Sequence, residues 1–228
     1  LAEVGFGAVL AGEKARGQRE IRDHADALAP AERLQPSALR MRFQESRIWT
    51  PDTRLDEQRL HDRAFLPAAV LIPVCETSAG PEVVLTRRSA QLRHHAGQIS
   101  FPGGRYEDSD ADLIATALRE TREETGIAEH SVEVLGTLPL YRTGTGYEVT
   151  PVVGLLQSAA DWAGDASEVT EIFTVPLHFL MNDAHHFLHR YVLTPEQVRH
   201  FYSMPYGEYF IWGATAGMLR NLYHFLRA

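Results

Sequence analysis

The stretch "GQISFPGGRYED" (Gly97–Asp108) is followed closely by "LRETREETG" (Leu118–Gly126), and this pair of segments decides the fold. The first segment predicts a rigid turn, because proline stiffens the backbone and paired glycines allow another chain segment to approach closely. Residues 110–125 contain no Pro or Gly and are rich in Ala, Leu, Arg and Glu, which predicts a helix. Ser109 fits the capping position before this helix, and Gly126 fits its stop. The sequence therefore predicts a glycine turn that leads into a highly charged helix.

Three carboxylates share one face of this predicted helix. At about 100° per residue, Glu120, Glu123 and Glu124 fall within a sector of roughly 100°. Like charges at this spacing repel one another, and Arg119 offsets only part of that cost. Such a cluster taken alone is more often a solvated helix face, but a hard divalent cation would turn the repulsion into attraction. The upstream turn can bring the carbonyl of Gly103 to the same ion, which favours a site for Mg²⁺ or Mn²⁺.

The order of the predicted elements indicates the fold class. Strands dominate the middle of the chain and helices lie early and late, which favours an α+β fold over repeated βαβ units. Residues 1–63 are expected to form a partly helical N-terminal extension, with helical pieces over 13–28 and 36–44, and residues 64–228 the main domain. Strands are expected over Ala68–Val74, Glu82–Arg88, Val132–Tyr141 and Tyr147–Leu156. A further strand is expected from Val169, and the chain should become helical after Pro176. Residues 190–202 show a mixed pattern, and a helix is expected at the C-terminus.

Composition narrows the classes of function. The chain has 228 residues and a net charge of −8, which argues against a general nucleic-acid binder, because such proteins present basic surfaces to phosphates. A single cysteine, Cys75, allows no intrachain disulfide and favours a reducing cytoplasm. No apolar run approaches the ~20 residues that a membrane-spanning helix needs. We therefore expect a cytoplasmic protein with neither nucleic acid nor membrane as partner. The net charge is compatible with a local basic pocket for a small phosphorylated ligand.

The spacing within Gly103–Gly126 resembles the Nudix box, whose usual form is G-x5-E-x7-R-E-U-x-E-E-x-G-U. Asp110 stands where the box has Glu, and one extra residue separates it from Arg119, so the role of Asp110 stays open. Thr121 occupies a position that is usually aliphatic. The resemblance implies a Nudix fold, an α/β/α sandwich with a central mixed β-sheet, and a metal-dependent hydrolase of nucleoside diphosphate derivatives. The matching residues are Arg119, Glu120, Glu123, Glu124, Gly126 and Ile127.

The stretch upstream of the box, "LTRRSAQLRHHAGQISFPGG" (Leu85–Gly104), resembles the signature of the coenzyme A pyrophosphatase subfamily. The stretches "TGYEVTPVVG" (Thr145–Gly154) and "IWGATAGML" (Ile211–Leu219) are also similar to that subfamily. Coenzyme A is strongly anionic, and arginines can clamp its phosphate oxygens through paired hydrogen bonds. The alternative is that these arginines are structural partners of the box carboxylates. The resemblance implies substrate binding by Arg88, Arg93, His95 and Gln98, and the adjacent Arg87 adds a further basic group. For His95 the alternative is an exposed loop residue.

The reaction implied is metal-assisted hydrolysis of the pyrophosphate of coenzyme A or its derivatives. Its products would be 3′,5′-ADP and 4′-phosphopantetheine or the acyl form. Glu120, Glu123, Glu124 and the Gly103 carbonyl are expected to bind the metal, and Arg119 is expected to support the carboxylates. Glu123 is the first choice for the base that removes the proton from water, and Glu168 and Glu171, on a later stretch, are the alternatives.

Two other interpretations stay open. The first is a Nudix hydrolase of another substrate, such as ADP-ribose or a dinucleoside polyphosphate. The second is a Nudix-fold module that binds without turnover, against which the intact carboxylate cluster speaks. A homodimer is also left open, since the N-terminal extension packs either on the domain or on a partner subunit. We interpret the histidines of the 185–189 segment as incidental, because no carboxylate or cysteine supports them: His185, His186 and His189.

Overall fold

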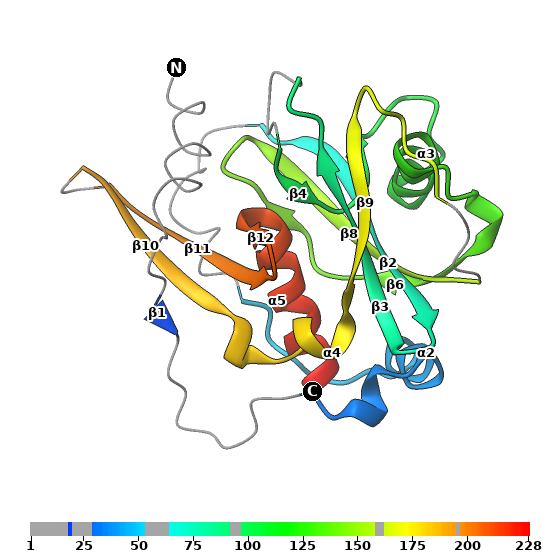
Figure 1. Cartoon of the computed structure of the whole chain (residues 1–228), viewed down its shortest axis with the longest axis horizontal. Coiled ribbons are helices and arrows are strands. Elements are labelled where there is room, and N and C mark those ends of the chain that lie inside the picture. The colour runs from blue at the N-terminus through cyan, green and yellow to red at the C-terminus, as the bar shows by residue number, and fades with distance from the viewer. Residues whose placement is uncertain (1–17, 20–28, 53–63, 92–96, 158–161, 195–196) are drawn as a thin grey trace.

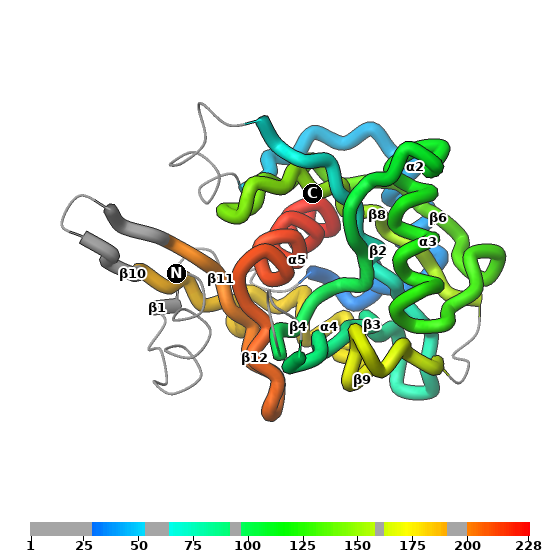
Figure 2. The backbone as a smooth tube through the Cα atoms, turned by 90° about the horizontal axis from the view of Figure 1, so that it is seen from above, coloured from blue at the N-terminus to red at the C-terminus, as the bar shows by residue number. Residues whose placement is uncertain are grey.

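The structure is a computed structural model that describes residues 18–19, 29–52, 64–91, 97–157, 162–194 and 197–228. A large mixed sheet lies between helix α3 (Leu113–Thr125) and helix α5 (Gly213–Arg227), and a smaller antiparallel sheet flanks α5 (Figures 1 and 2). This arrangement confirms the predicted α+β class and the sandwich of helices around a mixed sheet.

The larger sheet follows the order β4-β3-β2-β8-β6, and β5 pairs with β2, β7 with β8 and β9 with β3. Strands β2 and β8 run parallel, whereas the other pairings of this sheet in the described residues are antiparallel. The strands are β2 (Leu66–Thr77), β3 (Gly80–Arg88), β4 (Ile99–Ser100), β5 (Gly103–Arg105), β6 (Val132–Thr137), β7 (Tyr141–Arg142), β8 (Tyr147–Leu156) and β9 (Val169–Pro176).

The smaller sheet follows the order β1-β10-β11-β12 and is antiparallel throughout. Within the described residues, no helix is both long enough and apolar enough to cross a bilayer. The strands of this sheet are β1 (Gln18–Arg19), β10 (Phe187–Thr194), β11 (Gln197–Tyr206) and β12 (Tyr209–Trp212).

Short helices connect or flank the strands. They are η1 (Ala31–Leu34), α2 (Pro36–Gln44), η2 (Glu129–Ser131), α4 (Leu177–Leu180) and η3 (Asp183–His185).

The two faces of β2 serve two separate cores. Successive side chains of a strand point to opposite faces of a sheet. Ala69 and Leu71 accordingly pack with Ala117 of α3, whereas Ile72 and Val74 belong to the larger core that contains the buried residues of α5. The continuous apolar run of β2 thus reflects burial on both faces, as parallel pairing with β8 requires.

Helix α3 begins later than the sequence predicted. The predicted cap at Ser109 is wrong, because the capping residue is Asp112, whose Oδ1 accepts a hydrogen bond from the Ala115 N–H at 2.8 Å. The helix starts at Leu113, and the extra residue of the box is absorbed in the preceding loop. The predicted stop at Gly126 is confirmed, since this glycine ends the helix in the left-handed conformation with φ 73°.

The segment 29–52 is part of the folded body. Ala29, Leu34 and Leu39 are buried in the core that contains α5. The predicted helical piece over 36–44 is confirmed as α2. Of the predicted piece over 13–28, residues 18 and 19 form strand β1 and the other positions lie outside the described residues. The division of the chain between residues 63 and 64 stays a prediction.

Candidate active site

The two glycines of the turn allow close contacts with β2 and with helix α3. A Cβ atom at Gly103 would lie closer than 3.0 Å to the carbonyl oxygen of Ala69 and to Val70 on β2. A Cβ atom at Gly104 would lie closer than 3.0 Å to the carboxylate of Glu120 on α3. The predicted close approach is therefore present, and the turn brings β5 against the first carboxylate of the box.

Glu124 is the most deeply buried carboxylate of the site, with a side chain that is 2% exposed. Its Oε2 accepts a hydrogen bond from the Gly103 N–H at 3.1 Å. Its Oε1 lies 3.3 Å from Nη1 of Arg88, which comes from the end of β3. Burial raises the pKa of Glu124 to about 7, against the opposing effects of Arg88 and the Gly103 N–H.

Arg119 organises the carboxylates around it. Its Nη1 lies 3.0 Å from Glu120 and 3.2 Å from Glu123, and its Nη2 donates to the carbonyl of Arg105 at 3.1 Å. Its Nε donates to Asp110 at 2.8 Å. The hydrogen bond to Asp110 is the main reason why the pKa of Arg119 lies above its usual value. This geometry agrees with the predicted supporting role of Arg119.

Asp110 has a defined place that the sequence left open. Its carboxylate is buried and accepts hydrogen bonds from Arg119, from the Thr116 hydroxyl at 2.8 Å and from the Glu107 N–H at 3.0 Å. These bonds, that from Arg119 first, hold the pKa of Asp110 well below its usual range. Asp110 thus anchors Arg119 despite the altered spacing. The sequence did contain a sign of this pair, because Asp110 lies six residues after Gly104, where the box has an acidic residue, and Arg119 is the arginine of the box.

The remaining carboxylates lie toward solvent. Glu123 is 50% exposed and also lies 3.6 Å from Arg122. Glu168 is exposed in the turn before β9, and its carbonyl accepts a hydrogen bond from the Ser89 N–H at 2.7 Å. The Glu168 carboxylate is close enough that its charge helps to raise the pKa of Glu120, for which burial is the larger cause. The negative charge of Glu168 therefore acts on the carboxylates of the box.

The neighbours Arg87 and Arg88 point to opposite faces of β3. Arg88 faces Glu124 of α3. Arg87 instead lies 3.0 Å from Glu171 of β9, whose other oxygen accepts a hydrogen bond from the Tyr209 hydroxyl at 2.6 Å. Two predicted site residues, Arg87 and Glu171, are therefore joined to each other on the face away from the carboxylate helix.

The other predicted substrate-binding residues come from the loop after β3. The carbonyl of Gln98 accepts a hydrogen bond from the N–H of Arg88 at 2.9 Å, which places Gln98 beside that arginine. Arg93 and His95 lie outside the described residues.

The residues of the site fit a hard divalent cation by their chemistry. Burial first, and then the charges of neighbouring carboxylates such as Glu168, raise the pKa of Glu120 and Glu124, so their negative charges are only partly compensated by the protein. Oxygen donors of this kind suit Mg²⁺ or Mn²⁺. In the part of the chain that the structure describes, no three His, Cys, Asp or Glu side chains are arranged as a finished metal site; the carboxylates of Glu120 and Glu123 face Arg119 instead.

The histidines of the 185–189 segment have structural partners away from this site. His186 is buried between the Leu180 carbonyl and Arg220. His189 is buried against the Ser203 hydroxyl, with Nε2 2.7 Å from its Oγ. Both rings therefore take part in hydrogen bonds within the fold.

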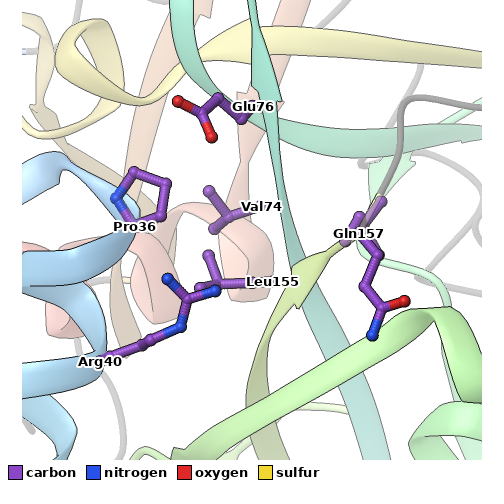
Figure 3. A pocket seen from close by; sticks show the side chains of 7 residues that line it. Pro36, Arg40, Val74, Glu76, Leu155 and Gln157 are labelled. Atoms are coloured by element: carbon purple, nitrogen blue, oxygen red, sulfur yellow. The ribbon is translucent and has the colours of Figure 1, made fainter.

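A separate pocket of about 280 Å³ opens where α2 crosses the carboxyl ends of β2 and β8 (Figure 3). Arg40 at its wall is held by Glu133 through paired hydrogen bonds of 2.7 and 2.8 Å. No carboxylate of the box lines this pocket, so it is distinct from the candidate site. Its lining residues are Pro36, Arg40, Val74, Glu76, Leu155, Leu156 and Gln157.

Comparisons with known proteins identify the family that combines such a glycine turn, charged helix and mixed sheet. The NUDIX domain pattern matches residues 65–198. The chain is 47% identical over 156 residues to "Uncharacterized Nudix hydrolase NudL" of Citrobacter koseri, covering 68% of this chain and 80% of that protein. It is 44% identical over 159 residues to the protein of the same name from Escherichia coli O1:K1 / APEC, with 68% and 80% covered.

A solved structure, that of a MutT/nudix family protein from Enterococcus faecalis, is similar with a TM-score of 0.46 and 14% identity over 74% of this chain and 65% of that one. The family pattern and the curated relatives show that the chain belongs to the Nudix hydrolases. Its activity in general terms is therefore hydrolysis of the pyrophosphate in a nucleoside diphosphate derivative, and enzymes of this family generally use divalent ions such as Mg²⁺ or Mn²⁺.

Proposed function

We propose that this Nudix hydrolase cleaves the pyrophosphate of coenzyme A or its derivatives, giving 3′,5′-ADP and 4′-phosphopantetheine or the acyl form. The observation that carries the proposal is the contact between Arg88 of the signature stretch and Glu124 of the box. Gly103 and Gly104, which end the same stretch, touch Glu124 and Glu120. The segment that resembles a coenzyme A signature is thus in direct contact with the proposed catalytic carboxylates.

Glu120, Glu123, Glu124 and the carbonyl of Gly103 are proposed to hold Mg²⁺ or Mn²⁺. A divalent cation at these ligands supplies Lewis-acid polarisation of phosphoryl oxygens and lowers the pKa of a bound water. Arg119, itself anchored by Asp110, keeps the carboxylates in position. This support matters because small displacements of reacting groups can reduce rates by about 10²-fold.

The substrate is proposed to be bound by basic side chains at the end of β3 and in the following loop. The Arg88 side chain is 26% exposed, so part of it is open to solvent in addition to its contact with Glu124. A planar guanidinium can bind phosphate oxygens in a bidentate manner. The proposed set is Arg88, Arg93, His95 and Gln98, whereas Arg87 is left out because it pairs with Glu171 on the opposite face of β3.

Glu123 is proposed as the base that removes the proton from the attacking water. It is half exposed and therefore open to solvent. Glu168 is the alternative, because it is exposed and lies near the buried carboxylates. Glu171 is less available, since the Tyr209 hydroxyl and Arg87 already occupy its oxygens.

A base typically contributes ~10²–10⁴-fold to the rate, so kcat should separate the candidates. We expect Glu123→Gln to lose at least about 100-fold and Glu168→Gln to lose much less. Glu171→Gln is the matched control, with little change in kcat. Mild and equal losses in the first two variants would overturn the assignment of the base.

The substrate is tested by incubating the protein with coenzyme A, acetyl-coenzyme A, ADP-ribose and NADH in Mg²⁺ or Mn²⁺. Mass spectrometry should find 3′,5′-ADP and 4′-phosphopantetheine from coenzyme A, and no cleavage after chelation of the metal. A Glu120→Gln, Glu124→Gln double variant controls for contaminating hydrolases. A protein that cleaves ADP-ribose but neither coenzyme A nor its thioester contradicts the proposal.

A further inference from the structure

Arg105 differs from the other arginines near the box in its partners. Arg88, Arg119 and Arg142 each form an ion pair with a carboxylate, at 3.3, 2.8 and 2.9 Å. Arg105 is exposed, and its guanidinium donates to the hydroxyl of Tyr147. No carboxylate pairs with Arg105 among the residues that the structure describes. Its positive charge is therefore free to attract an anion beside an otherwise acidic site.

The backbone of Arg105 is fixed to the site. Arg105 is the last residue of β5 and pairs with Ala68 of β2. Its carbonyl accepts a hydrogen bond from Nη2 of Arg119 at 3.1 Å, and the next N–H, that of Tyr106, donates to the Pro67 carbonyl at 3.1 Å. The side chain thus starts from a rigid position two residues after Gly103.

The direction of the side chain separates it from the carboxylates. A Cβ atom at Gly104 would point at the carboxylate of Glu120. Because side chains alternate along a strand, Arg105 points to the opposite face of β5. An anion bound by Arg105 is consequently not the group that lies among the box carboxylates, but a second one farther along the ligand.

Tyr147 holds the guanidinium without neutralising it. The centroid of the Tyr147 ring lies 5.1 Å from the Arg105 guanidinium carbon, which is the geometry of a cation–π contact. Tyr147 is itself fixed by Thr143, whose hydroxyl accepts its N–H at 3.0 Å and whose N–H donates to its carbonyl at 2.8 Å. Tyr147 belongs to the stretch Thr145–Gly154, for which the proposed chemistry gave no role.

We propose that Arg105, positioned by Tyr147, forms a subsite for a phosphate monoester of the substrate, distinct from the scissile pyrophosphate. This inference rests on the proposed function, in which the ligand with such a group is coenzyme A and the group is its 3′-phosphate. A guanidinium with free paired donors recognises a phosphate dianion through charge-assisted hydrogen bonds. Arg105 thereby distinguishes coenzyme A from nucleotides that lack the additional phosphate.

The test compares coenzyme A with 3′-dephospho-coenzyme A in the wild type and in Arg105→Met. We expect KM for coenzyme A to rise about 10-fold or more in the variant, with kcat nearly unchanged, because charged hydrogen bonds of binding are lost. For 3′-dephospho-coenzyme A, both constants should stay the same. Tyr147→Phe should give a smaller rise in KM for coenzyme A alone. Arg142→Met, in which an exposed arginine paired with Glu148 is removed, is the control and should not change KM.

Equal losses on both substrates would overturn the inference, since Arg105 would then bind the pyrophosphate. Unchanged KM values would overturn it as well. Binding of adenosine 3′,5′-bisphosphate and of 5′-AMP, measured by calorimetry, decides the question without turnover. Only the bisphosphate should bind more weakly to Arg105→Met. If the wild type does not cleave coenzyme A, the proposed function fails, while this binding comparison still supports or refutes the subsite.

Discussion

Helices α3 and α5 cover opposite faces of the same sheet, yet they are built on different principles. The face of α3 toward the turn carries Glu120 and Glu124, whose pKa values are raised by burial. The face of α5 toward the sheet is apolar, with Leu219 and Leu222 almost completely buried. One helix thus concentrates charge where the fold gains little stability from it, and the other supplies apolar burial.

The ends of the two helices differ in the same way. Helix α3 is ended by its own next residue, Gly126. The last carbonyls of α5 are instead bound by arginines from a distant segment: Arg42 Nε donates to the Phe225 carbonyl at 2.8 Å, and Arg33 donates to the carbonyls of Leu226 and Arg227. The difference teaches that the end of the carboxylate helix α3 is defined locally, whereas the end of α5 depends on contacts with a distant segment of the chain.

The largest effect is expected from a cavity in the α5 face. Leu222→Ala should lower the free energy of unfolding by about 2–5 kcal/mol, because Leu222 is 1% exposed and the space left cannot refill completely. Urea denaturation measures this change. Leu140→Ala, at a leucine that is 51% exposed, is the control and should change stability little. Comparable losses in both variants would contradict the claim that apolar burial on the α5 face stabilises the fold.

A methyl group added at Gly104, on the α3 side of the sheet, should affect activity rather than stability. In Gly104→Ala the new Cβ would lie within 3.0 Å of the Glu120 carboxylate, so this proposed metal ligand must move. We expect kcat to fall by about 10²-fold, while the melting temperature changes little. Steady-state kinetics and thermal denaturation measure the two quantities on the same sample.

Gly80→Ala provides the opposite control, because Gly80 has φ 112° in a hairpin turn with open space around its Cβ position. Strain at this position should cost roughly 1 kcal/mol of stability and leave kcat unchanged. If Gly104→Ala kept its full activity, the close approach of turn and helix would not matter for catalysis.

A third effect concerns pH and Arg220 of α5. His186 is buried, and its Nδ1 lies 3.0 Å from Nη1 of Arg220 while its Nε2 lies 2.7 Å from the Leu180 carbonyl oxygen. A neutral ring that accepts from Arg220 and donates to Leu180 satisfies both contacts. Burial first, with the charges of Arg220, His224 and His185, lowers the pKa of His186 from 6.5 to about 3.

Because the unfolded chain binds a proton at His186 more readily than the native state does, this residue stabilises the fold above pH 6.5, and that contribution is lost as the pH falls toward 3. Over the same range the buried Glu124, whose pKa is raised to about 7, acts in the opposite direction, because its carboxyl gains a proton more readily in the native state. The His186 contribution is therefore measured as the difference between the wild type and His186→Gln, by urea denaturation in the presence of a chelator. We expect the wild type to lose about 2 kcal/mol relative to the variant between pH 7 and pH 5. An NMR titration of the wild-type ring is an independent check, since a midpoint near 6.5 would contradict this account.

The local half of this comparison could be predicted from sequence. The glycine turn, the carboxylate helix and the stop at Gly126 follow from short-range patterns, and so do strand β9 and the helical start after Pro176. The start of α3 was predicted too early because Asp110 is drawn out of the helix by Arg119, nine positions away. Composition alone does not reveal such a pairing.

The long-range half could not be predicted in the same way. The parallel pairing of β2 with β8 and the hairpin of β10 with β11 join segments whose own sequence patterns do not name their partner. The prediction that Arg87 and Glu171 lie in the same site as Arg88 overlooked the alternation of side chains along a strand. Alternation sends Arg87, with its partner Glu171, to the face opposite Arg88. The arginines that cap α5 come from more than a hundred positions away, where no periodicity indicates them.

The smallest effect is expected where α5 touches the turn of the active site. The hydroxyl of Thr215, in the first turn of α5, donates to the carbonyl of Ile99 on β4 at 3.1 Å. Thr215→Val keeps the shape and removes this bond, which should raise KM or lower kcat a few-fold, with about 1 kcal/mol lost in stability. Thr215→Ser should restore both kinetic constants because the donor returns. If valine changes stability but neither kinetic constant, α5 supports the fold without positioning the site, and the two helices are more independent than their shared sheet suggests.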